Sequence, residues 1–444
     1  MRYAAVWMQR WGQPSSQARS TEGRGFRWIR VISVFSNRKF EFTRSIWDHH
    51  GAVVERIEYL GQLRRLARQF PVVGVLGARQ VGKTTLARQF ARSWQGASAH
   101  FDLEDPDDLA RLAEPMLTLR AMRGLILLDE IQRLPNLFSV LRVLADERPR
   151  RRSFVVLGSA APGLLKQSSE TLAGRIAYLE LPPFSLAEIA ENDRERLWLR
   201  GGFPRSFLAR SHAESMTWRR SFRQTFIERD VPQLGIPYTP APAALGRFWT
   251  MLAHVHGQLL NWSELGRSMG VSDVTVRRYT DVLEGALVVR QLKPWHENIG
   301  KRQVKSPKLY FRDAGLLHTQ LGIATSSELR VHPRVGASWE GFLLEQIRIV
   351  LRLEPDECYF WRTEHGAELD LLVIRGGRRW GFVVKRTAQP ALTKSMRSAL
   401  HDLGLDRLWF VHAGDQSFPL GERVDAVSWQ HLVDRLANER RGAR

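Results

Sequence analysis

The chain has 444 residues, 43% of them hydrophobic, which is enough to form several packed cores and excludes a disordered or fibrous protein. This length predicts two to four domains. The formal net charge of +20 favours an anionic partner, nucleic acid first, although the excess of arginine over lysine is also what a GC-rich genome produces. Cys358 is the only cysteine, and no apolar run approaches the roughly 20 residues that span a bilayer. We therefore expect a cytoplasmic protein with no intramolecular disulfide and no membrane partner.

Residues 1–52 differ from the rest of the chain. The first fifty residues hold nine basic side chains against three acidic ones, and their tryptophans follow no helical or strand period. No apolar core of a signal peptide follows the basic start. Two interpretations stay open: a basic arm that touches nucleic acid, or an extension added by a wrong start codon, with the protein beginning near Val53 or Val54.

Residues 71–84 have the order of a phosphate-binding loop. An apolar run at 71–76 predicts a strand, the sequence GARQVGKT follows at 77–84, and a helical pattern begins at Leu86. Glycines let backbone N–H groups surround a phosphate, Lys83 can reach the β- and γ-phosphates, and the Thr84 hydroxyl can bind Mg²⁺. The alternative is a tight turn with a surface lysine. The sequence predicts that ATP and Mg²⁺ bind here, on Gly77, Ala78, Arg79, Gln80, Val81, Gly82, Lys83, Thr84 and Thr85.

Two further strands are predicted after this loop, each ending in polar residues. The run at 123–129 reads as a buried strand that ends in Asp129 and Glu130, which suits Asp129 for holding Mg²⁺ and Glu130 for polarising the attacking water. A solvated acidic pair is the alternative. The strand at 154–158 ends before Ser159, which could hydrogen-bond the γ-phosphate or simply cap a helix. Helical spacing at 135–148 lies between these strands, so the pattern predicts a doubly wound α/β sheet.

These motifs, taken in order, resemble a known family. The loop GARQVGKTTL, the strand LLDEIQ, the turn GSA, the segment SETLAGR ending at Arg175, the turn GGFP and the element ERD at 228–230 look like a large family of bacterial and archaeal AAA-type ATPases with a C-terminal domain of unknown function. The resemblance runs from about Val53 to the C-terminus. It implies an AAA fold, hydrolysis of Mg-ATP and a small helical lid after the ATPase sheet.

Two arginines are candidates for an arginine finger, which must approach the γ-phosphate from the same subunit or from a neighbouring one. Arg175 closes the SETLAGR segment, and Arg229 lies in the ERD element. Each could instead form a structural ion pair. With Glu130, Lys83 and Ser159, they complete the predicted catalytic residues, and an oligomer stays possible.

Residues 261–283 predict a helix-turn-helix. Ser263 is expected to cap the first helix, Gly270 to make the turn and Ser272 to cap the second helix. Strands at 287–292 and 308–311, joined by a basic loop, would complete a winged helix of the kind that reads a major groove. The alternative is that this segment packs against other domains or mediates assembly. The residues expected to contact DNA are Ser272, Thr275, Arg277, Arg278, Lys301, Arg302 and Lys305.

The last region resembles the restriction-endonuclease-like core that the family carries at its C-terminus. An active core implies a helix acid, a strand aspartate and a Glu-x-Lys pair, and Glu340, Asp370 and Lys385 match three of these positions. Val383 stands where the glutamate is expected, and it cannot bind a metal ion. We therefore expect a degenerate nuclease site.

The expected division is an extension (1–52), an ATPase domain with its lid (53–235), a winged helix (236–325) and a nuclease-like domain (326–444). The function predicted is hydrolysis of Mg-ATP that drives a conformational change, coupled to DNA through the last two domains. Two alternatives stay open: a slow ATP-dependent switch or scaffold that binds a protein partner, and an ATP-dependent nuclease.

Overall fold

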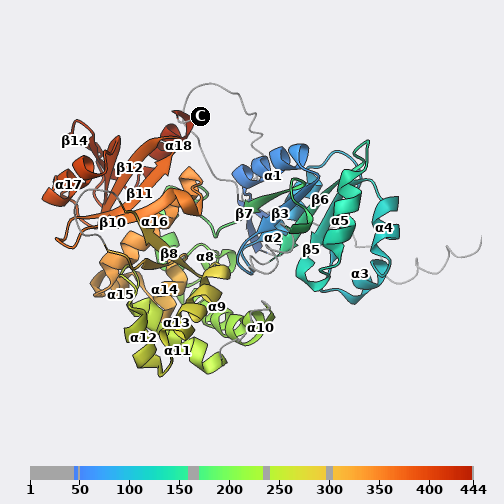
Figure 1. Ribbon diagram of the computed structural model, residues 1–444, viewed down its shortest axis with the longest axis horizontal. Helices are drawn as coiled ribbons and strands as arrows, with labels where there is room; N and C mark the ends of the chain where they lie inside the picture. Colours follow the sequence, from blue (N-terminus) through green and yellow to red (C-terminus); the bar gives the residue numbers. More distant parts are fainter. Residues whose placement is uncertain (1–44, 49–50, 159–169, 234–240, 297–303, 443–444) are drawn as a thin grey trace, which may run out of the picture. The chain divides into compact units, whose positions relative to one another are not determined.

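The computed structural model describes residues 45–48, 51–158, 170–233, 241–296 and 304–442 (Figure 1). Of the predicted extension, only a short antiparallel hairpin is described, formed by β1 (Ser45–Asp48) and β2 (Gly51–Val54). Across the described residues, no helix is both long enough and apolar enough to cross a membrane.

A five-stranded sheet carries the phosphate-binding loop, and all its strands are parallel. Their order is β4, β5, β6, β3, β7. This is the predicted α/β arrangement, with one strand, β6, between the loop strand β3 and the acidic strand β5. The strands are β3 (Val72–Leu76), β4 (Ser98–Asp102), β5 (Gly124–Asp129), β6 (Arg152–Gly158) and β7 (Ile176–Glu180).

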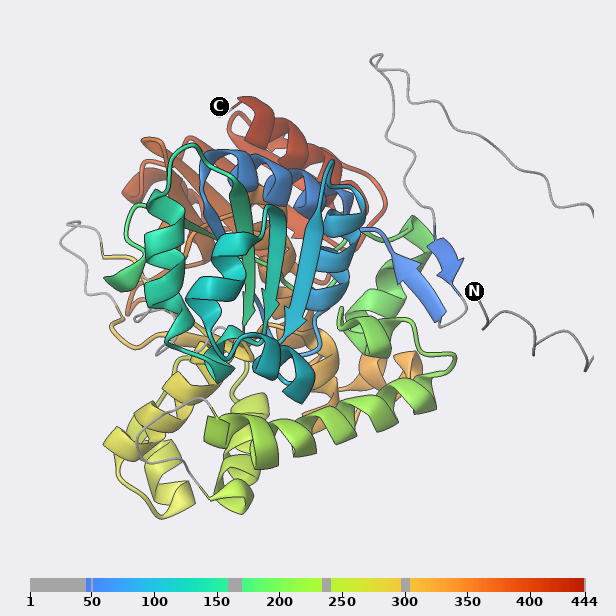
Figure 2. The ribbon, with the colours of Figure 1, turned by 90° about the vertical axis from the view of Figure 1, so that its right-hand side faces the viewer.

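Helices cover both faces of this sheet (Figure 2). Successive strand residues point to opposite faces, so Val73, Val75 and Leu127 pack with α1 (Ile57–Gln69) and α2 (Lys83–Arg92). The alternate strand residues pack against the other layer, which includes α5 (Leu137–Asp146), within the helical pattern predicted at 135–148. That layer also holds α3 (Pro106–Arg111), α4 (Pro115–Ala121) and η1 (Ile131–Arg133).

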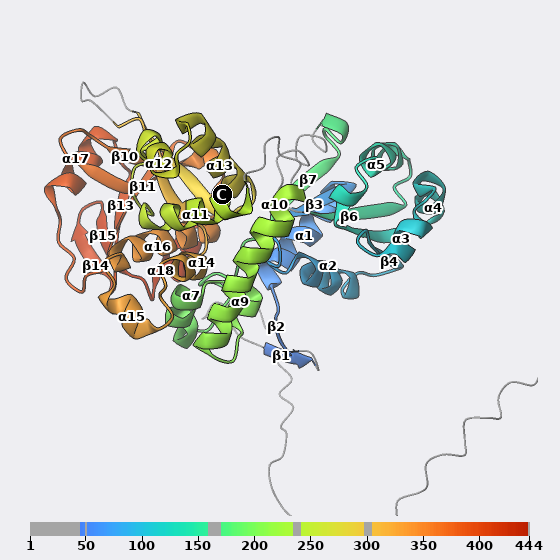
Figure 3. The ribbon, with the colours of Figure 1, turned by 90° about the horizontal axis from the view of Figure 1, so that it is seen from below.

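A helical segment follows β7, as the AAA resemblance implies for a lid. Its last three elements follow one another without a break, from α9 through a π-helical turn to α10 (Figure 3). The elements are η2 (Glu191–Asp193), α7 (Arg194–Arg200), α8 (Pro204–Phe207), α9 (His212–Thr225), η3 (Phe226–Asp230) and α10 (Val231–Gln233).

The predicted helix-turn-helix is formed by α12 (Trp262–Met269) and α13 (Asp273–Gly285), which follow α11 (Pro242–His254). Gly270 ends α12 in the left-handed conformation (φ +69°), which makes the expected turn. An antiparallel hairpin of β8 (Val289–Pro294) and β9 (Lys308–Phe311) comes next.

This hairpin belongs to the sheet of the C-terminal region, because β8 also pairs in parallel with β10 (Cys358–Arg362). The sheet has eight strands in the order β14, β15, β13, β12, β11, β10, β8, β9 and is mixed in direction. One sheet therefore crosses the boundary expected near residue 326. The remaining elements are α14 (Ala314–Gln320), α15 (Ser326–Val331), α16 (Val335–Leu351), η4 (Pro355–Glu357), β11 (Glu368–Arg375), β12 (Arg378–Lys385), α17 (Lys394–Asp402), β13 (Arg407–His412), β14 (Phe418–Gly421), β15 (Val424–Ser428) and α18 (Leu432–Gly442).

Candidate nucleotide-binding site

The loop between β3 and α2 has the backbone that a phosphate cradle needs. Gly82 sits at the N-cap of α2 with φ +101°, a conformation that other residues rarely adopt. A Cβ at Gly77 would lie 2.6 Å from the carbonyl oxygen of Leu181, so the loop passes too close to the segment after β7 for a side chain there. Both glycines are thus required by the path of the loop.

Lys83 is held inside this loop. Its Nζ donates to the carbonyl oxygens of Gly77 and Ala78, each at 3.1 Å, and its side chain is buried. Burial lowers the pKa of the Lys83 ammonium, against the opposing charges of Glu130 and Asp129. The alternative of a surface lysine on an ordinary turn does not describe this side chain.

Thr84 and Asp129 form the pair expected for a metal-binding role. The Thr84 hydroxyl donates to Oδ2 of Asp129 at 2.7 Å, across the 45 residues that separate them in sequence. Asp129 ends β5, which is separated from the loop strand β3 by β6, and its side chain is buried. A hydroxyl and a carboxylate at this position are hard oxygen ligands, so these two residues fit Mg²⁺. In the described part of the chain, no group of three or more His, Cys, Asp and Glu side chains is placed to hold a metal ion.

Glu130 follows directly in the left-handed conformation (φ +54°), a backbone that is uncommon outside glycine. Its carboxylate accepts a hydrogen bond from Gln132. Burial raises the pKa of Glu130, although the nearby Lys83 ammonium opposes the shift. Ser159, the predicted sensor, comes directly after β6 and lies outside the described residues.

A cavity of about 460 Å³ opens beside the loop. From the predicted binding residues it is lined by Arg79, Gln80, Val81, Gly82, Lys83, Thr84 and Thr85, with Glu130. Leu86 and Gln89 of α2 also line it. Three other segments add residues to which the sequence analysis gave no role: Val54, Arg56, Phe184, Pro204, Arg205 and Leu208. The GGFP turn was a recognisable signal for this wall, because Pro204 and Arg205 lie at its end.

The structure brings Arg229 to the loop edge of the sheet. Its guanidinium lies 3.9 Å from Glu104, and 55% of the side chain is exposed. The neighbouring Asp230 pairs with Arg79 of the loop, which ties the helical segment after β7 to that loop. Asp230 therefore joins the site, although its role was not predicted.

Arg175 lies at the opposite edge of the sheet. The amide N–H of Val72, which begins β3, donates to the carbonyl oxygen of Arg175, while the loop begins after the other end of that strand. The Arg175 side chain forms a two-pronged ion pair with Asp146, at 2.7 and 2.8 Å. A role for Arg175 at the site of its own subunit does not agree with this placement.

Four of the predicted DNA-binding residues lie in α13 or at its N-cap, and Lys305 precedes β9. Ser272 caps α13 as expected, by accepting from the N–H of Thr275, whereas α12 is capped by Asn261 and not by Ser263. Arg277 stacks over the ring of Trp262 at 5.0 Å. Arg277, Arg278 and Lys305 are exposed, and Lys301 and Arg302 lie outside the described residues.

The three residues of the expected nuclease site come together in the C-terminal region. Asp370 on β11 accepts from the N–H of Val384 at 2.8 Å and lies 3.8 Å from the Lys385 ammonium. Burial and the Asp370 carboxylate raise the pKa of Glu340 to about 7. Val383, in place of a glutamate, is buried in an apolar cluster.

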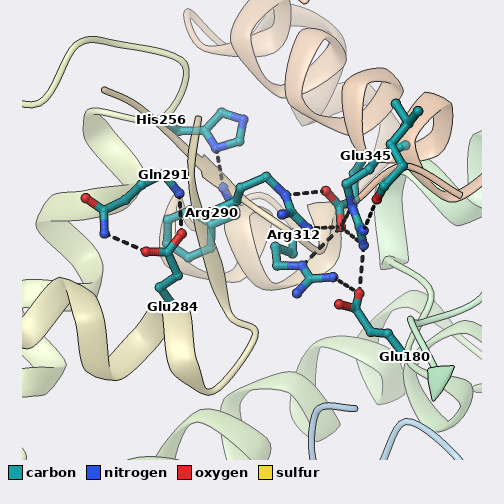
Figure 4. Close-up of polar contacts among 10 residues, drawn as sticks. Glu180, His256, Glu284, Arg290, Gln291, Arg312 and Glu345 are labelled. Carbon is teal, nitrogen blue, oxygen red and sulfur yellow. Dashed lines mark hydrogen bonds and ion pairs between the residues drawn. The ribbon is translucent and has the colours of Figure 1, made fainter. Parts of the chain in front are cut away.

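A charged network links β7 to the hairpin and to α16 (Figure 4). Glu180, the last residue of β7, contacts Arg312 and accepts from Arg348 at 2.7 Å. Both arginines also bind Glu345, at 3.0 and 3.1 Å, and Glu345 binds Arg290 of β8. Burial alone would raise the pKa of Glu345, but the three guanidinium groups hold it well below its usual range.

The parallel sheet, the loop at the N-terminus of α2 and the Thr84–Asp129 pair define an AAA-type P-loop nucleoside triphosphatase. The family models agree: an AAA domain matches residues 69–190, and two domains of unknown function, DUF8612 and DUF4143, match residues 191–327 and 335–432.

The chain belongs to the same family as two uncharacterized proteins, from Mycobacterium tuberculosis and Mycobacterium bovis. Each is 50% identical over 381 residues, which are 86% of this chain and 85% of the relative.

Two solved structures are similar in part. A Walker-type ATPase of Pyrococcus abyssi has 14% identity and a TM-score of 0.42, covering 61% of this chain and 96% of that one. A RuvB variant of Thermotoga maritima has 19% identity and a TM-score of 0.27, covering 54% and 90%.

Proposed function

We propose that this protein hydrolyses Mg-ATP and uses the cycle to move its helix-turn-helix and C-terminal sheet, in the cytoplasm and in contact with DNA. The observation that carries the ATPase part is the Thr84–Asp129 bond beside a cavity of about 460 Å³ that Lys83 and Thr84 line. Cavities of this size accept small-molecule cofactors.

The chemistry follows from the positions of these residues. Backbone N–H groups of residues 77–85 and the N-terminal end of α2 would bind the phosphates, and Lys83 would exchange its two carbonyl partners for phosphate oxygens. Thr84 and Asp129 would hold Mg²⁺, which neutralises charge on the phosphates. Glu130 would accept the proton of the attacking water, and Ser159 would contact the γ-phosphate.

Two arginines would compensate charge during hydrolysis. Arg229 is supported for a role within its own subunit, because its neighbour Asp230 binds Arg79 of the loop. Arg175 is supported only for a role in a neighbouring subunit, since it lies at the far edge of its own sheet. The proposed active form is therefore an oligomer.

Coupling is supported by the network that begins at Glu180. Glu180 is in register with Leu76, the residue before the phosphate loop, and the next residue donates to the Leu76 carbonyl at 2.7 Å. A change in the loop would thus reach Arg312 and Arg348, and through Glu345 the strand β8. Exposed Arg277, Arg278 and Lys305 are the described residues that would contact DNA phosphates. Ser272 and Thr275, at the start of α13, would reach base edges, and Lys301 and Arg302 would add phosphate contacts from the loop.

The test is steady-state ATP hydrolysis with and without duplex DNA, with Lys83→Ala and Glu130→Gln as controls. We expect DNA to stimulate turnover, and both variants to lower it by at least about a hundredfold, with Glu130→Gln still binding ATP. Turnover by either variant at the wild-type rate would refute the assigned site. Turnover that DNA leaves unchanged would refute the coupling to DNA.

A second candidate is a slow ATP-dependent switch that binds a protein partner. It is favoured by one observation: β8 and β9 are built into the C-terminal sheet through β10, so the hairpin serves packing within the chain. The same DNA experiment separates the two, because only a protein-binding switch would turn over at one rate with and without DNA.

A further inference from the structure

Lys308 lies within a cluster of carboxylates that was not predicted to contain it. Its Nζ lies 2.5 Å from Oε1 of Glu368 and 3.4 Å from Oε1 of Glu340, and only 4% of its side chain is exposed. The Asp370 carboxylate acts on the same ammonium, and the three carboxylates together raise the pKa of Lys308 in spite of its burial. A buried ammonium is stable only when it is paired in this way.

The restriction-endonuclease resemblance implies a divalent cation at these carboxylates, so its fit can be tested against the contacts. Oε1 of Glu340 already accepts from the Tyr310 hydroxyl at 2.5 Å, in addition to the Lys308 contact. Oδ2 of Asp370 accepts the N–H of Val384, and its other neighbour is the Lys385 ammonium. One oxygen of Glu340 and one of Asp370 are therefore already engaged by hydrogen-bond donors, which leaves fewer lone pairs for a cation.

Charge and coordination number lead to the same result. A divalent cation among these carboxylates would stand beside a buried ammonium, a repulsion that is strong where water is excluded. A hard cation also needs about six oxygen ligands. Val383, a hydrocarbon side chain buried in an apolar cluster, supplies none. A cation here would therefore depend on Glu340, Glu368 and Asp370, the carboxylates that Lys308 occupies. The metal that the resemblance implies does not fit this cluster.

We propose that the ammonium of Lys308 takes the place of a divalent cation among Glu340, Glu368 and Asp370. The cluster is then an internal cation site that closes the nuclease-like fold to metal. Lys308 belongs to β9, Glu340 to α16 and the two other carboxylates to β11. The same ion pairs therefore fasten the hairpin that follows the helix-turn-helix to the C-terminal sheet. This inference is independent of the ATPase proposal.

The test is Mn²⁺ binding to the nucleotide-free protein at pH 8, followed by the electron paramagnetic resonance of free Mn²⁺. Each protein is measured with Asp370 intact and with Asp370→Asn. The difference between the two measurements is the Mn²⁺ bound at this cluster, because Mn²⁺ bound by Thr84 and Asp129 contributes equally to both. The wild type should show no Asp370-dependent binding. Lys308→Met keeps the apolar stem of the side chain and removes its charge. This variant should bind Mn²⁺ at least about tenfold more tightly than the wild type. The double variant Lys308→Met, Asp370→Asn should lose that increase in affinity.

Two controls define what would overturn the proposal. Lys308→Arg keeps the cation and should stay free of Mn²⁺, as should Lys305→Met, which removes an exposed lysine three residues away. Asp370-dependent Mn²⁺ binding by the wild type overturns the proposal, and so does Lys308→Met that folds and gains none. If Lys308→Met does not fold, the wild-type measurement still decides, because an Asp370-dependent site there is incompatible with an occupied cluster.

Discussion

Arg175 tests whether a neighbouring subunit contributes a residue to the nucleotide site. In its own subunit the residue is level with the start of β3, whereas the phosphate loop begins five strand residues further on, about 16 Å away at 3.3 Å per residue. An arginine finger must touch the γ-phosphate. We therefore predict that Arg175 acts on the nucleotide of an adjacent subunit.

The perturbation is Arg175→Ala, with Asp146→Ala as its matched control. Both variants break the same exposed ion pair, but only the first removes the guanidinium. A finger contributes on the order of 10³–10⁵ in turnover. Arg175→Ala should therefore lose at least about a thousandfold in turnover while still binding ATP, and Asp146→Ala should hydrolyse ATP at close to the wild-type rate.

Subunit mixing gives the decisive assay. Lys83→Ala and Arg175→Ala are each expected to be inactive, but a mixed interface joins an intact loop from one to an intact Arg175 from the other. Random 1:1 assembly makes roughly a quarter of the interfaces competent, so turnover should return to about that fraction. A mixture that stays inactive, or an Asp146→Ala variant as impaired as Arg175→Ala, would refute this reasoning and leave Arg175 a structural residue.

Three further predictions each concern the substitution of one residue. Because burial raises the pKa of Glu130, the acid limb of the turnover–pH profile should lie above the usual carboxyl range, and Glu130→Gln should lower turnover by about 10²–10⁴. Glu180→Gln should lower the free energy of unfolding at pH 7 by roughly 1–2 kcal/mol. This is less than the loss for a fully buried ion pair, because 38% of the Glu180 side chain is exposed. The pKa of Glu180 is lowered to about 2, so that contribution is complete above about pH 4.5, and urea midpoints of variant and wild type should converge as the pH falls toward 2. Arg277→Ala should weaken filter binding of duplex DNA alike for all sequences and reduce the slope of log affinity against log salt by about 1, whereas an unchanged slope would remove Arg277 from the DNA contacts.

The candidate nucleotide site was predictable because its signals are local. Residues 77–84 carry the loop in one continuous stretch, and an apolar strand ending in Asp129 marks the second part. The only long-range step was the assumption that the ends of parallel strands meet at one edge of the sheet, and the bond from Thr84 to Asp129 confirms it. Elements with clear apolar periodicity, such as α5 and β6, were found within a few residues of their bounds.

What the sequence did not predict depends on contacts between distant segments. Lys308 is one of 66 basic residues, and nothing near it in sequence distinguishes it from a surface lysine. Its place is decided by the packing of β9 beside α16, which brings it to Glu340 across 32 residues. The first cap of the helix-turn-helix failed for a smaller reason. Asn261 and Ser263 are both good caps, and the helix begins at Trp262, which gives the position to Asn261.

The same distant contacts bear on how the proposed cycle would act. The hairpin β8–β9 is bonded through β10 into the C-terminal sheet and paired there through Lys308, so this sheet supports the segment that follows the helix-turn-helix. The described contacts that join this support to the ATPase sheet include Glu180, whose strand runs beside the one that leads into the phosphate loop. A nucleotide-dependent shift of that loop would therefore be passed on as a movement of the whole support, because packed interfaces change between discrete arrangements and do not deform continuously. Glu180→Gln should accordingly uncouple turnover from DNA while leaving the Lys83 loop and basal hydrolysis intact. The outcome that would contradict this is equal stimulation by DNA in the variant and the wild type.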